Sequence, residues 1–236
     1  MATAETAAIP VATPQLAPEQ PSYHPAVRWF AVLVAAVAVA LLVLSFLVAV
    51  DARPGGLPEA LDAATQGQLF VIALRLLVPL LILRWSLVGG ILAMLVDATD
   101  VIVVEFFGPG GMGGHYSQLD KGLDSYYLAL EAVVAWYWLN PWARWTALAL
   151  FVYRLVGAVL FEATQVRALL FVFPNLFENW WLYCVVVARV RPRWLPTSWR
   201  STVVPLLILL VPKMAQEWLL HVAEAQPWSW FKDTFL

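Results

Sequence analysis

The stretch WFAVLVAAVAVALLVLSFLVAV, residues 29–50, contains 22 consecutive residues without a charge. An α-helix rises about 1.5 Å per residue, so a run of this length crosses the roughly 30 Å hydrocarbon core of a bilayer. The apolar region of a cleaved signal peptide is shorter, about 7–15 residues. We therefore predict a retained first transmembrane helix here, with a signal peptide as the alternative.

The composition of the whole chain agrees with a membrane protein. Of the 236 residues, 62% are hydrophobic and 13% are charged, whereas soluble domains average about 45–50% and about 25%. The net charge of −2 gives no sign of a basic surface for nucleic acid. We expect the lipid bilayer as the main partner, no nucleic acid, and a bacterial-type inner or plasma membrane as the location.

Six further apolar segments predict an all-α, polytopic transmembrane helix bundle with about seven spans. If residues 69–107 form one kinked helix, the number of spans is six. The predicted ranges are Leu69–Leu83, Leu87–Phe107, Leu123–Leu139, Ala143–Ala163, Ala168–Ala188 with Pro174 inside it, and Thr202–Val222.

The first residues differ from the rest of the chain. Residues 1–25 are rich in Ala and Pro and have no apolar period, so they cannot bury enough surface to order themselves. We predict a disordered tail over residues 1–25 and one helix-bundle domain over residues 26–236.

The basic residues of the loops predict the orientation. Short loops rich in Lys and Arg stay in the cytoplasm. One side of the predicted bundle carries seven arginines: Arg28, Arg84, Arg144, Arg189, Arg191, Arg193 and Arg200. The other carries four basic residues: Arg53, Lys121, Arg167 and Lys232. We predict an internal N-terminus and an external C-terminus.

Charged residues inside the predicted spans are the main functional signal. Each costs at least about 2.5–3.5 kcal/mol at the bilayer centre, so such residues face the bundle interior and find partners. The bases within or near the spans are Arg75, Arg154, Arg167 and Lys213. The acids are Asp97, Asp100, Glu105, Asp120, Asp124, Glu131, Glu162, Glu178 and Glu217. The excess of acids predicts carboxylates that are protonated, hydrated or bound to an external cation.

Helical phase gathers several of these acids on common faces. At about 100° per residue, Asp124 and Glu131 lie about 40° and 20° from Asp120, on one stripe. Lys213 and Glu217 can pair at i, i+4, with His221 one turn further on. We take as candidate cation- or proton-binding residues Asp97, Asp100, Asp120, Asp124, Glu131, Glu217 and His221. As their polar-interior partners we take Arg75, Arg154, Arg167, Glu178 and Lys213.

The spacing Asp97-x2-Asp100, then Gly114, then Asp120-x3-Asp124 resembles the signature of the CDP-alcohol phosphatidyltransferases. The stretch LFVIALRLLVPLL before it is a looser likeness. The resemblance implies six spans and four aspartates that hold divalent metals and activate an acceptor hydroxyl. The chain departs from the family at Val101, where the family has Gly, and at Val104-Glu105, where it has Ala-Arg. Its second aspartate pair is also displaced by two residues.

The sequence therefore predicts a small cation- or proton-linked transporter or binding protein. The alternatives are a divergent CDP-alcohol phosphatidyltransferase-like lipid enzyme and a non-catalytic subunit of a membrane complex, so catalysis stays undecided. No HExxH-like spacing indicates a metal centre, and no motif identifies a cofactor. A membrane-protein partner or a homo-oligomer is compatible with the sequence.

Overall fold

The computed structural model describes residues 14–18, 21–49, 63–106, 116–166, 168–221 and 223. Within these ranges all regular secondary structure is helical, which confirms the predicted all-α class. The helices are α1 Pro25–Ala49, α2 Ala63–Leu77, η1 Val78–Leu83, α3 Ser86–Glu105, α4 Tyr116–Trp136, α5 Pro141–Thr164, α6 Ala168–Val172, α7 Leu176–Val190, η2 Pro192–Trp194 and α8 Trp199–His221.

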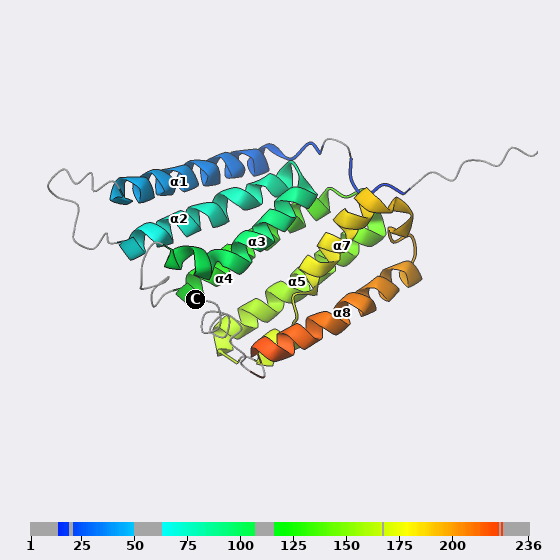
Figure 1. The fold of residues 1–236 in the computed structure, drawn as a ribbon. Helices are drawn as coiled ribbons and strands as arrows, with labels where there is room; N and C mark the ends of the chain where they lie inside the picture. Colours follow the sequence, from blue (N-terminus) through cyan, green and yellow to red (C-terminus); the bar gives the residue numbers. More distant parts are fainter. Residues whose placement is uncertain are drawn as a thin grey trace, which may run out of the picture.

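The long helices lie alongside one another in a bundle (Figure 1). α1 packs along α2, and α2 packs against α3 and α4. α5, α7 and α8 contact one another in the other half of the bundle, and α4 joins the halves through its contacts with α5 and α7.

Five of the described helical segments are long and apolar enough to cross a membrane: Pro25–Leu47, Gln66–Leu83, Pro141–Thr164, Ala168–Val190 and Trp199–Leu219. They correspond to the first, second, fifth, sixth and seventh predicted spans. Large apolar side chains on their outer faces are exposed, among them Leu33 at 63% and Ile208 at 66%. Such surfaces suit contact with lipid and indicate a helical membrane protein. α3 and α4, which carry Asp97, Asp100, Asp120, Asp124 and Glu131, are not among these segments of the described residues, and the total of seven spans stays a prediction.

The second and third predicted spans are separate helices rather than one kinked helix. η1 ends at Leu83, α3 begins at Ser86, and α2 and α3 pack against each other. Gly89 allows this tight reversal, because a Cβ atom there would lie 2.3 Å from the backbone nitrogen of Ile82.

The sixth predicted span is interrupted next to Pro174. α6 ends at Val172 and α7 begins at Leu176, because Pro174 lacks an N–H and its ring clashes with the preceding turn. Side chains take up the freed backbone groups. Arg154 Nη1 donates to the carbonyl of Phe173 at 2.9 Å. The N–H of Asn175 donates to Glu217 Oε1 at 3.2 Å.

Part of the predicted N-terminal tail contacts the bundle. The carbonyl of Leu16 accepts a hydrogen bond of 2.7 Å from the N–H of Leu139, in the α4–α5 turn. Tyr23 packs edge-on against Tyr137, and burial raises the pKa of the Tyr23 hydroxyl to about 12. Residues 14–18 and 21–24 thus line the end of the bundle, while disorder of the rest of the tail stays a prediction.

Candidate functional site

Arg75 of α2 lies at the centre of four aspartates from α3 and α4. Its side chain is buried, and Nη1 donates to Asp100 Oδ2 at 2.6 Å and to Asp120 Oδ1 at 2.5 Å. Nη2 donates to carboxylate oxygens of Asp97 and Asp124. We call these five residues the aspartate centre. It brings together one predicted interior partner and four predicted cation-binding residues.

Helical spacing explains why each pair of aspartates faces Arg75. Residues three or four positions apart are neighbours on one face of a helix, and Asp97 and Asp100 have this relation on α3. Asp120 and Asp124 have it on α4. Because α2, α3 and α4 pack against one another, both faces meet the guanidinium of α2.

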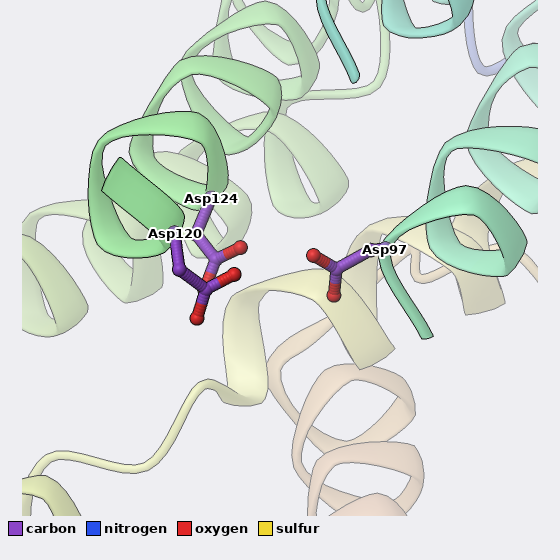
Figure 2. Close-up of side chains that lie close together, drawn as sticks. All are labelled: Asp97, Asp120 and Asp124. Carbon is purple, nitrogen blue, oxygen red and sulfur yellow. The ribbon is translucent and has the colours of Figure 1, made fainter. Parts of the chain in front are cut away.

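The aspartate centre is closed on one side and open on the other. The side chain of Asp100 is 2% exposed, whereas those of Asp97, Asp120 and Asp124 are 35%, 32% and 40% exposed. Figure 2 shows the carboxylates of Asp120 and Asp124 turned toward that of Asp97 across the space between α4 and α3. One oxygen from each lies within 4.8 Å of the others.

This spacing fits a hard cation. Ca²⁺ binds oxygens at about 2.3–2.6 Å, so ligands on opposite sides of the ion lie up to about 5 Å apart; for Mg²⁺ the corresponding separation is about 4 Å. The three oxygens can therefore reach a Ca²⁺-sized ion as they stand and a smaller one after slight closure. The resemblance to the CDP-alcohol phosphatidyltransferases implied a grouping of this kind, whereas no HExxH-like spacing did.

A second group of polar residues lies between α4, α7 and α8. Lys213 and Glu217 pair at 3.1 Å, as their i, i+4 spacing predicts. Asn175 Nδ2 donates to Glu178 Oε2 at 2.8 Å. Glu131 of α4 is fully buried, and neither of its carboxylate oxygens has a hydrogen-bond partner among the described residues. The sequence placed Glu131 on the acidic face of α4 but gave no sign that it lacks a partner.

The remaining predicted residues are placed differently or lie outside the described part. Arg154 donates to a backbone carbonyl at the α6–α7 break, in a position set by Pro174. Arg167 and the side chain of His221 lie outside the described residues.

The end of the bundle away from the aspartate centre is rich in arginine. A cavity of about 1420 Å³ lies there, bounded by residues 14–18, the start of α3, the α4–α5 turn and the end of α7, and it is lined by Arg84 and Arg189. All seven arginines of the predicted cytoplasmic side lie at this end, by the direction of the helices. These seven arginines thus lie at one end of the described bundle, and the aspartate centre lies toward the other.

The described chain is a helical bundle with five candidate membrane spans and a charged centre between α2, α3 and α4. Comparison with protein-family models, curated proteins and solved structures finds no match to this chain. The likeness to the CDP-alcohol phosphatidyltransferases therefore rests on the sequence motifs alone.

Proposed function

We propose that this protein is a cation-binding membrane protein, a small cation- or proton-linked transporter or binding protein, whose cation site is the aspartate centre. The observation that carries the proposal is the convergence of four aspartates on a single guanidinium. If all five groups are ionised, three negative charges are left over. An excess of this size in a partly enclosed site favours an additional cation.

Asp97, Asp120 and Asp124 are the proposed ligands. Their oxygens are mutually close and their side chains reach the open side. Asp100 is buried against Arg75 and holds the guanidinium in place. Carboxylate oxygens are ligands that Ca²⁺, Mg²⁺ and Mn²⁺ share, so the site is proposed for a hard divalent cation.

Loss of one ligand should weaken cation binding. Free ligand at 100 times its Kd stabilises the folded state by about 2.7 kcal/mol, so CaCl₂ or MnCl₂ should raise the thermal midpoint of the purified full-length protein. Asp124→Asn removes one charge at nearly constant shape and should reduce that response by at least half. The matched control is Glu162→Gln, at a side chain that is 56% exposed on α5. Equal responses in wild type and both variants, or no response at all, would contradict the proposal.

A lipid head-group transferase is the second candidate function. The observation that favours it is that both aspartate pairs of the resemblance meet at one point, which four metal-holding aspartates require. In a transferase of this kind the aspartates hold divalent metals and activate the acceptor hydroxyl. The reaction takes place on the cytoplasmic side of the membrane.

Membrane topology separates the two candidates. With the buried Cys184 replaced by Ala, we expect Arg193→Cys in intact cells to resist an impermeant thiol reagent and Glu162→Cys to react. This result follows from the arginine asymmetry, and it places the end of the bundle near the aspartate centre outside. The reverse pattern would overturn the predicted orientation and favour the transferase.

A further inference from the structure

Glu131 is a buried carboxyl group without a donor among the described residues. Its side chain is 0% exposed, and both oxygens lack a hydrogen-bond partner within the described chain. Its position is fixed, because the backbone carbonyl of Glu131 accepts a hydrogen bond of 3.0 Å from Trp181 Nε1 of α7. Trp181 in turn stacks on Trp138. The side chain of Glu131 is therefore enclosed by the described part of the bundle.

The neighbouring charge is another carboxyl group. Glu178 of α7 acts electrostatically on Glu131, and no described cation acts on Glu131 directly. Glu178 itself has donors in the amide of Asn175 and the hydroxyl of Tyr127. Burial opposes a charge on Glu178, and so does the negative charge of Asp97, whereas the positive charge of Lys213 and, more weakly, that of Arg154 favour it.

Two physical rules decide how this pair is charged. An isolated carboxylate in an apolar interior costs far more than the neutral acid, so the group takes up a proton instead. Two carboxyl groups that share one site do not both ionise. Since the donors and cations surround Glu178, the negative charge belongs there and the proton belongs on Glu131.

We propose that Glu131 and Glu178 form a proton-binding site inside the bundle, in which Glu131 carries the proton and Glu178 carries the negative charge. The site takes one proton from water and returns it to water, and no other reactant is needed. The proposal is independent of cation binding at the aspartate centre. In this proposal the protein binds a proton at a site separate from the aspartate centre.

Infrared spectroscopy of the full-length protein near neutral pH tests the proposal directly. Wild type should show the carbonyl stretch of a protonated carboxylic acid in an apolar setting. Glu131→Gln should abolish this band, and Glu131→Asp should shift it. Glu162→Gln, an exposed control, should leave it unchanged. Absence of the band in wild type, or its persistence in Glu131→Gln, overturns the proposal.

Thermal unfolding gives a second readout with a defined sign. The folded state holds a proton that the unfolded chain releases, so the contribution of Glu131 is present at low pH and is lost as the pH rises. One proton corresponds to about a tenfold change in the unfolding equilibrium constant per pH unit. Glu131→Gln should flatten the decline of wild type by up to this amount above about pH 5, where a glutamate of the unfolded chain is ionised. A midpoint that follows Na⁺ or K⁺ concentration at fixed pH, and not pH, would assign Glu131 to a metal cation and overturn the proposal.

Discussion

Arg75→Leu is expected to destabilise the protein by about 3–5 kcal/mol, because removal of one partner leaves buried charge uncompensated. The guanidinium is the shared partner of all four aspartates of the centre. Thermal or denaturant unfolding of the full-length protein in detergent near neutral pH measures the effect. Addition of CaCl₂ should restore part of the loss, since a divalent cation can neutralise the same carboxylates.

Two variants control for the charge and for the position of Arg75. Arg75→Lys keeps the charge but loses the planar fork, so its stability should lie between those of wild type and Arg75→Leu. Arg193→Leu alters an exposed arginine and should change stability by no more than about 0.5 kcal/mol. If Arg75→Leu proves as stable as Arg193→Leu, the aspartate centre does not hold α2, α3 and α4 together.

Alanine at Gly89 should destabilise the protein by about 1–3 kcal/mol or more, as overpacking does. The new Cβ would lie 2.3 Å from the backbone nitrogen of Ile82 and 2.5 Å from the carbonyl carbon of Leu81. Backbone atoms cannot rotate away as a side chain can, so η1 and α3 must separate. Equilibrium unfolding near neutral pH gives the comparison with wild type.

Gly122→Ala is the matched control within α4. A Cβ atom there would meet nothing within 4 Å, and alanine is favoured over glycine inside a helix by about 0.5–1 kcal/mol. Gly122→Ala should therefore stabilise the protein. Effects of the same sign at Gly89 and Gly122 would contradict the close approach of η1 and α3.

The helices were predictable wherever apolar residues run for the length of a span. α1 and α5 follow the predicted ranges closely for this reason. α4 begins at Tyr116, about two turns before the predicted start at Leu123, because its first turns are polar and have no apolar signal. Those turns carry Asp120 and Asp124 to the aspartate centre.

The residues that share a helix face in the site were predictable, whereas the contacts that they make with other helices were less so. Helical phase places Asp120, Asp124 and Glu131 on one stripe, but it does not state which helix lies opposite. The pairing with Arg75 depends on how α2 packs against α3 and α4. The missing donor at Glu131 depends on α7, where the approaching charge is another acid. These contacts depend on how the helices pack together, and the periodicity of the sequence does not predict that packing.

The break between α6 and α7 has a consequence for the order in which the chain is made. The acceptor for the N–H of Asn175 is Glu217, which lies 42 residues later in α8. A ribosome completes the broken segment before it has made that acceptor. An unsatisfied backbone group costs several kcal/mol in lipid, so this N–H must stay in a hydrated setting until α8 arrives. The last helix thus completes the insertion of the segment before it.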